Sequence, residues 1–212
     1  MLSRLLLLLL LPLTVLTVGA VPQATSPAEL GKLWLASVQA EKALDYPGAL
    51  KQVSGFVQNG GDPFMAALRT GWLFYLSADY RKAEASYAKA LQLQPTSVNA
   101  LLGALNAVRA QLDPAKTERA AQALLQVECS HYTALMTVAG IHYAAADYRK
   151  AASAYRRALV YYPDDFDALS GSAWSSLNAG DKAAAVPQFT RLLSSSPEYP
   201  QAQSGFQKAG GR

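Results

Sequence analysis

The sequence predicts an all-α solenoid built from antiparallel helix pairs, and three observations support this fold class. The segment SADYRKAEASYAKALQLQP, which starts at Ser77, returns from Ala145 as AADYRKAASAYRRALVYYP, displaced by 68 residues throughout. Asp recurs at half that displacement, at positions 45, 79, 113, 147 and 181. Ala stands four residues after each of these positions except the third, where the residue is Thr117. A displacement held without slippage indicates a structural repeat of 34 residues.

In this register five repeats follow one another along the chain. They occupy residues 30–63, 64–97, 98–131, 132–165 and 166–199. Each repeat divides into two helices of roughly 13 residues, about 20 Å long, which are joined near the recurrent Asp. Residues 21–29 lead into the first repeat, and residues 200–212 are expected to close the last one with a short capping helix.

Several helix starts are marked by capping residues. Residues 26–29 contain Ser, Pro and Glu in the order of a capping box, and Asp62 and Asp113 each precede a proline. The tandem Asp164 and Asp165 are expected to cap a further helix. Each such cap contributes about 1 kcal/mol to helix stability.

The residues at fixed offsets resemble the tetratricopeptide repeat family, whose pattern has a small residue and an aromatic in the first helix, then Ala, an aromatic, Ala and Pro in the second. The second repeat carries Gly71, Phe74, Ala83, Tyr87, Ala90 and Pro95 at these offsets. The fourth carries Ala139, His142, Ala151, Tyr155, Ala158 and Pro163, and the fifth Ala173, Ala185, Phe189, Leu192 and Pro197. The resemblance implies a right-handed superhelical solenoid, in which aromatic side chains fill the spaces between successive repeats.

The resemblance also implies where a partner would bind. In this family the second, fifth, ninth, twelfth and thirteenth residues of each repeat form a concave surface. The predicted groove residues are Trp34, Leu68, Trp72, Tyr75, Asn99, Asn106, Arg109, Met136, Tyr143, Trp174 and Asn178. Trp, Tyr and Arg are typical of binding hot spots, so the predicted function is an adaptor or scaffold that binds a protein or peptide. The alternative is that the three Trp residues only pack between neighbouring helices.

The first 20 residues have the pattern of a secretory signal peptide. Arg4 precedes an apolar run over residues 5–18, and small residues follow, which places cleavage between Ala20 and Val21. The alternative is an uncleaved membrane anchor, but a spanning helix needs roughly 20 apolar residues. The expected location is therefore outside the cytoplasm, periplasmic or secreted. The lack of an Asn-x-Ser/Thr acceptor favours a bacterial cell envelope.

The residues needed for catalysis or metal binding are scarce. The chain has one Cys and two His, and it has no glycine-rich phosphate loop and no paired metal-ligand spacing. We therefore expect no enzyme activity, no cofactor, no metal site and no small-molecule substrate. The net charge of +4 is spread without basic runs, so a nucleic-acid partner is not expected either.

Two other functions remain open at this stage. In a self-assembling scaffold the end repeats, and not the groove, would make the contacts, and light scattering would then detect an oligomer without a partner. A more distant alternative is an enzyme that uses Cys129 with His131, for which loss of a measurable activity in Cys129→Ser would be needed.

Overall fold

The computed structural model describes residues 26–211, and within them the chain forms eleven α-helices and no strand. The helices are α1 Pro27–Lys42, α2 Tyr46–Gln58, α3 Pro63–Leu76, α4 Tyr80–Leu93, α5 Val98–Ala110, α6 Pro114–Val127, α7 Tyr132–Ala144, α8 Tyr148–Tyr161, α9 Phe166–Asn178, α10 Lys182–Ser195 and α11 Ala202–Ala209. The all-α prediction is thus confirmed. The predicted signal peptide and its cleavage site lie outside the described residues.

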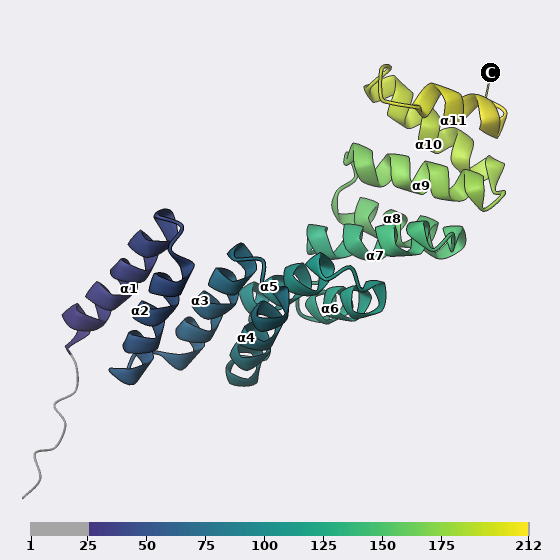
Figure 1. Cartoon of the computed structure of the whole chain (residues 1–212). Helices are drawn as coiled ribbons and strands as arrows, with labels where there is room; N and C mark the ends of the chain where they lie inside the picture. The colour runs from purple at the N-terminus through teal and green to yellow at the C-terminus, as the bar shows by residue number, and fades with distance from the viewer. Residues whose placement is uncertain (1–25, 212) are drawn as a thin grey trace, which may run out of the picture.

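The helices pack in series, each against the next one in the sequence. They form an elongated, bent stack with α1 and α11 at opposite ends (Figure 1). The hydrophobic core consists of consecutive clusters of buried residues along the stack, as expected for a protein in which each repeat contacts only its neighbours.

The recurrent Asp builds the same turn in all five repeats. Its carboxylate accepts a hydrogen bond of 2.9–3.4 Å from the backbone N–H three residues later, which caps the second helix of the repeat. The residue before it adopts the left-handed conformation, with φ between 58° and 83°. These residues are Leu44, Ala78, Leu112, Ala146 and Gly180. The turn and the cap together explain why Asp marks the 34-residue period.

The other predicted caps are present with one exception. Ser26 accepts from the Glu29 N–H at 3.3 Å, and the Asp62 carboxylate accepts from two N–H groups of the first turn of α3. Of the tandem acids only Asp165 caps α9, whereas Asp164 forms an exposed ion pair with Arg191. The interpretation of both acids as caps was therefore wrong for Asp164.

Successive repeats are joined by an aromatic ring that packs onto a glycine of the next repeat. A Cβ atom added at Gly103 of α5 would lie 2.3 Å from the ring of Tyr87, on α4. The ring is 5% exposed, and its burial raises the pKa of Tyr87 to about 12. We call this contact the ring–glycine joint. It recurs between Tyr155 and Gly171, and between Phe189 and the glycine of α11 at position 205.

The joint between the third and fourth repeats lacks both partners. The position of Tyr87 is occupied there by Ala121 of α6, and the position of Gly103 by Thr137 of α7. Neither side chain has an aromatic ring, so α6 and α7 meet through smaller aliphatic groups. The joint between the first and second repeats also lacks both partners, with a valine and an arginine at these positions. The stack changes direction between α6 and α7 (Figure 1).

We expect Gly171→Ala to destabilise the protein by about 1–3 kcal/mol, because the added methyl group would overpack against the Tyr155 ring at 2.5 Å. Gly140→Ala is the matched control, since a Cβ atom at Gly140 of α7 would meet nothing within 4 Å. Alanine should there stabilise the helix by roughly 0.5–1 kcal/mol. Urea unfolding followed by circular dichroism measures both changes. Equal midpoints for the two variants would contradict the ring–glycine joint.

Candidate functional site

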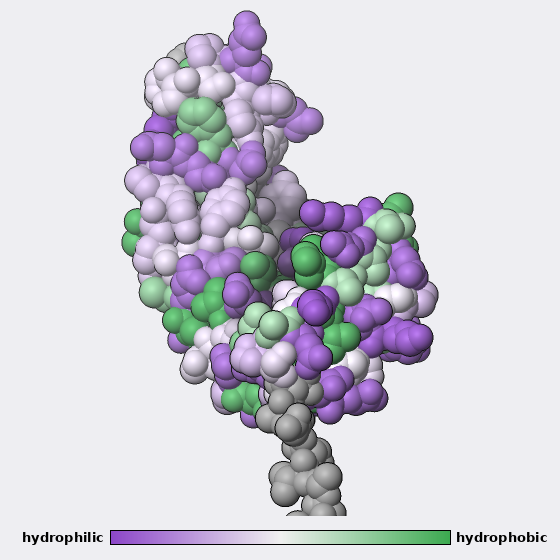
Figure 2. Space-filling model, turned by 90° about the vertical axis from the view of Figure 1, so that its left-hand side faces the viewer, coloured by the Kyte–Doolittle hydropathy of each residue, from purple (hydrophilic) through white to green (hydrophobic). Residues whose placement is uncertain are grey.

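The predicted groove residues all lie on the first helices of the repeats, α1, α3, α5, α7 and α9. Their side chains do not form one continuous strip, because several of them pack against neighbouring helices. On the face of the molecule shown in Figure 2, apolar side chains form separate patches among polar ones. A binding surface on these helices can therefore consist only of separate local groups of residues.

The first group connects α1 and α3 through a polar cluster. Glu41 forms an ion pair with Arg69 and accepts a hydrogen bond of 3.0 Å from Nε1 of Trp72. Arg69 also donates to the buried Ser37 hydroxyl at 3.1 Å, and its guanidinium lies 6.0 Å from the centre of the Trp34 ring. These contacts fix the edge of the Trp72 indole while 42% of the residue stays exposed.

Trp72 continues into a short aromatic row. Its ring stacks on Tyr75 with centroids 6.0 Å apart and planes inclined by 18°, and Tyr75 in turn lies 5.6 Å from the Tyr80 ring. Leu68, one helical turn before Trp72, is half-buried and packs into the core. The Trp72–Tyr75 pair is thus a preorganised aromatic surface on α3.

Trp34 and Trp174 lie in different surroundings from Trp72. The Trp34 ring packs 5.3 Å from Phe56 of α2, and the Trp174 ring lies edge-on, 5.4 Å from the buried Phe189 of α10. Lys208 of α11 also lies over the Trp174 ring at 5.6 Å. Packing between neighbouring helices therefore accounts for these two residues.

The predicted asparagines of the groove differ in their hydrogen-bond partners and in their exposure. Asn178 of α9 donates to the Tyr143 hydroxyl of α7 at 3.2 Å, which links two adjacent first helices. Asn99 is exposed and Asn106 half-buried on α5. Between residues 26 and 211, no hydrogen bond joins either Asn to another predicted groove residue.

The structure brings two predicted residues together in an apolar cleft of about 740 Å³, which α7 forms with the end of α5, the following turn and the start of α6. Arg109 of α5 and Met136 of α7 lie on its wall. Leu112, Thr137 and Ile141 also line it, although no pattern in the sequence indicated them. We call this space the α5–α7 cleft.

The α5–α7 cleft coincides with the incomplete joint described above. Thr137, which replaces the joint glycine, lines the cleft, and Gly140 leaves space in front of its own backbone. At the rim, Leu112 is 87% exposed, and the exposed Arg109 side chain has no hydrogen bond or ion pair inside the described part of the chain. An apolar floor with an unpaired guanidinium at its edge can hold a side chain and orient the peptide that carries it.

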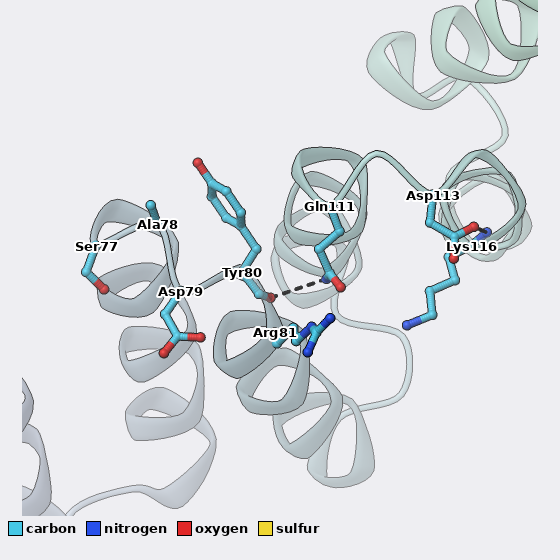
Figure 3. Close-up of a pocket in the computed structure, with 8 residues that line it drawn as sticks. All are labelled: Ser77, Ala78, Asp79, Tyr80, Arg81, Gln111, Asp113 and Lys116. Carbon is cyan, nitrogen blue, oxygen red and sulfur yellow. Dashed lines mark hydrogen bonds between the residues drawn. The ribbon is translucent and has the colours of Figure 1, made fainter.

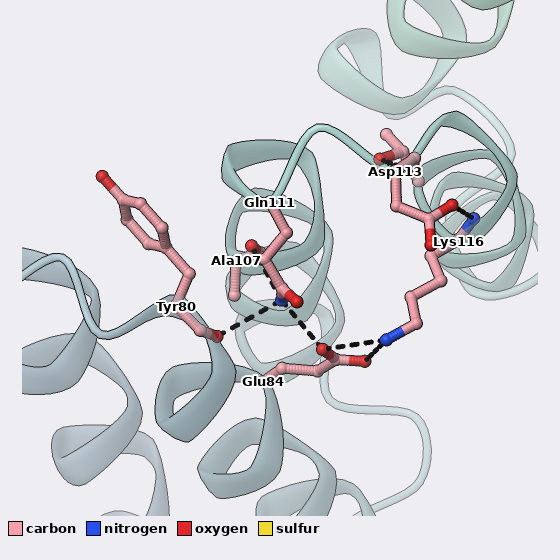
Figure 4. A network of polar contacts seen from close by, with 7 residues as sticks. Tyr80, Glu84, Ala107, Gln111, Asp113 and Lys116 are labelled. Atoms are coloured by element: carbon pink, nitrogen blue, oxygen red, sulfur yellow. Dashed lines mark hydrogen bonds and ion pairs between the residues drawn. The ribbon is translucent and has the colours of Figure 1, made fainter.

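A second concave region of about 800 Å³ lies between the second and third repeats and is mainly polar. It is lined by the turn before α4 and by Arg81, Gln111 and Lys116 (Figure 3). Gln111 donates to the Glu84 carboxylate at 2.8 Å, and the Lys116 ammonium lies 3.4 Å from the same carboxylate (Figure 4). Since Glu84 holds both donors, this network braces the two repeats.

The arrangement of Cys129 and the histidines does not resemble a catalytic dyad. Cys129 is exposed, and its Sγ lies 3.4 Å from the Tyr161 hydroxyl, a contact that raises the pKa of Tyr161. His131 Nδ1 is buried and unpartnered in the described residues, and His142 lies 3.4 Å from Glu118. Within residues 26–211, no three His, Cys, Asp or Glu residues lie close enough together to hold a metal ion.

Across residues 26–211, no helix combines the length and the apolar character that a membrane-spanning helix needs.

Comparisons with known proteins agree with the repeat pattern. Residues 139–202 match the tetratricopeptide repeat family model. Among curated protein sequences, none matches this chain. Solved structures with similar folds include the MamA protein, with a TM-score of 0.68 at 16% identity over 82% of this chain and 94% of that one.

Two further structures show the same architecture. A tetratricopeptide repeat protein from Parabacteroides merdae aligns with a TM-score of 0.69 at 16% identity, over 86% of this chain and 72% of that one. YrrB, described as a repeat protein of this type with an unusual peptide-binding site, aligns with a TM-score of 0.65 at 11% identity, over 82% and 90% of the two chains. The fold defines a solenoid of stacked helix hairpins. With the family match, it supports the assignment of this chain as a tetratricopeptide repeat protein.

The different surroundings of the tryptophans predict different effects of truncation. Trp174→Ala should lower the melting temperature, because it removes an aromatic contact with the buried Phe189 and leaves a cavity worth about 3 kcal/mol or more. Trp72→Ala should change the melting temperature much less, since 42% of Trp72 is exposed and it contacts no fully buried ring. Thermal unfolding by circular dichroism measures both. If Trp72→Ala melts as early as Trp174→Ala, the aromatic surface on α3 is part of the core.

Proposed function

We propose that this protein is an exported, non-enzymatic adaptor or scaffold that binds a protein or peptide partner on the row of first helices. The tetratricopeptide repeat fold itself suggests a protein-interaction scaffold. The observation that carries the proposal further is the α5–α7 cleft, which combines an apolar floor with the unpaired Arg109. The Trp72–Tyr75 pair offers a second contact on the same row of helices.

The chemistry of these two places favours a peptide-like partner. An apolar side chain of the partner would enter the cleft, and its backbone or a carboxylate would meet Arg109, as in helix-in-groove or extended-peptide recognition. Such a partner would gain most of its affinity from a few buried anchors. The peptide-binding site described for YrrB is consistent with this mode of recognition in a protein of similar fold.

Export is supported by the N-terminal sequence pattern. We expect N-terminal sequencing of protein from the exported fraction to give Val21 as the first residue, because the apolar run is short and ends in small residues. A chain that starts at Met1 and stays in the membrane pellet would contradict cleavage and favour the anchor.

Gly140→Phe should block the α5–α7 cleft without disturbing the core, because nothing lies within 4 Å of a Cβ atom there. The affinity for the partner should fall about thirtyfold, which corresponds to the loss of about 2 kcal/mol of binding free energy at a hot spot. The melting temperature should stay unchanged. The assay is affinity capture from the native envelope with quantitative mass spectrometry, in which partners are compared between wild type and variant.

Ser153→Phe is the matched control, because it adds the same ring at an exposed position of the second helix α8. Capture should be retained in this variant. Tyr87→Ala provides the opposite control, since it removes a joint ring and should lower the melting temperature. Equal capture by Gly140→Phe and Ser153→Phe would show that the partner binds elsewhere, and an oligomer in light scattering without a partner would favour self-assembly.

A further inference from the structure

A glutamate at one position of the second helix ties the repeats together in the middle of the chain. In the second repeat it is Glu84, which binds Gln111 and Lys116 of the third repeat. In the third repeat it is Glu118, which lies 3.4 Å from His142 of the fourth. In both cases a carboxylate of one repeat is held by donors of the next.

The fourth repeat lacks this carboxylate. The equivalent residue is Ala152, 34 positions after Glu118, and it is buried. The equivalents of Gln111 and Lys116 in the fifth repeat are alanines, and the equivalent of His142 is Ser176. Ser176 is 2% exposed, and its hydroxyl has no hydrogen-bond partner in the part of the chain that the structure describes.

The position that a glutamate side chain would occupy adjoins a pocket of about 460 Å³. It is lined by Arg149 and Arg156 of α8, by Ser176 of α9 and by the turn that leads to Asp181. The two arginines are seven residues apart and therefore share one face of α8. Both are exposed, and neither guanidinium group has an ion pair or hydrogen bond with any other residue from 26 to 211.

We propose that this pocket binds a carboxylate supplied from outside the chain, by an Asp or Glu side chain of a partner protein. The partner's carboxylate takes the place that Glu84 and Glu118 fill in the preceding repeats. Guanidinium groups bind a carboxylate through two parallel hydrogen bonds, so Arg149 and Arg156 supply the charge and the directional donors. The Ser176 hydroxyl is a further donor at the base of the pocket.

Asp181 favours a carboxylate over a phosphate. This residue lies at the rim, where one of its carboxylate oxygens accepts from the Ala184 N–H at 3.0 Å and caps α10. Its negative charge opposes a ligand that carries two charges more strongly than one that carries a single charge. The pocket therefore matches a monoanion.

The carboxylate pocket is separate from the α5–α7 cleft. It opens between the second helix α8 and the α9–α10 turn, whereas the cleft is lined by α7, the end of α5 and the start of α6. No residue lines both. The protein thus has a second place for a partner. If the carboxylate pocket binds nothing, the function proposed for the α5–α7 cleft is unaffected.

Nuclear magnetic resonance of the arginine Nε–H groups tests the pocket directly. The probe is N-acetylglutamate α-amide, which carries one carboxylate, added to the intact protein at constant ionic strength. We expect saturable shifts at Arg149 and Arg156. Arg81 is the internal control, because it holds the position of Arg149 in the second repeat, where Glu84 is present. Equal shifts at all three arginines would overturn the proposal.

Inorganic phosphate is the second arm of the titration. It should perturb Arg149 and Arg156 less than the glutamate probe does at the same concentration. A larger response to phosphate would overturn the assignment to a carboxylate and would identify a general anion site instead.

Ala152→Glu should close the pocket from within, since it restores the residue of the second and third repeats. The probe should then bind about tenfold more weakly or not at all. Ala85→Glu is the matched control, because it adds the same charge at an exposed position of α4, in another repeat from the two arginines, and should leave binding intact. Arg149→Gln, an exposed change that spares the core, should weaken the probe equally. Wild-type affinity in both Ala152→Glu and Arg149→Gln would exclude the pocket.

Discussion

The contact between an aromatic ring and a glycine of the following repeat determines how this solenoid is assembled. Tyr87, Tyr155 and Phe189 can approach the next helix only because no Cβ atom stands in the way. Each such contact fixes the distance and angle between neighbouring repeats. Where Ala121 and Thr137 replace the pair, the repeats still stack, but the space between the first helices opens into the α5–α7 cleft. The same sequence positions thus hold a ring–glycine contact at three joints, whereas the joint between the third and fourth repeats has a possible binding surface and the first joint has Val53 and Arg69 instead.

Much of the fold was predictable because it depends on residues that are present at regular spacing. The recurrent Asp marked the turn of each repeat, and Ala83 and Ala151 marked close helix contacts, where both are fully buried. Tyr87 was expected between repeats and is found there. These signals are local or periodic, so one sequence is enough to detect them.

The candidate sites were less predictable, because they depend on missing groups and on neighbours from other helices. The cleft lies where Ala121 provides no aromatic ring and Thr137 replaces a glycine. A periodic sequence pattern does not show how much space such a missing ring leaves. Trp34 and Trp174 share the register of the groove, yet Phe56 and Phe189 cover them from the second helices. The carboxylate pocket likewise becomes visible only when Ala152 is compared in space with Glu84.

The incomplete joint also has a mechanical consequence. The two arms of the solenoid, α1–α6 and α7–α11, each contain ring–glycine joints, whereas the contact between the arms contains none. Bending the molecule at that point displaces no ring–glycine contact, so the stack should bend more easily between α6 and α7 than at the three joints that have one. A load applied to the two ends would be taken up there more readily than at the ring–glycine joints, and the distance between the ends would vary with the width of the cleft.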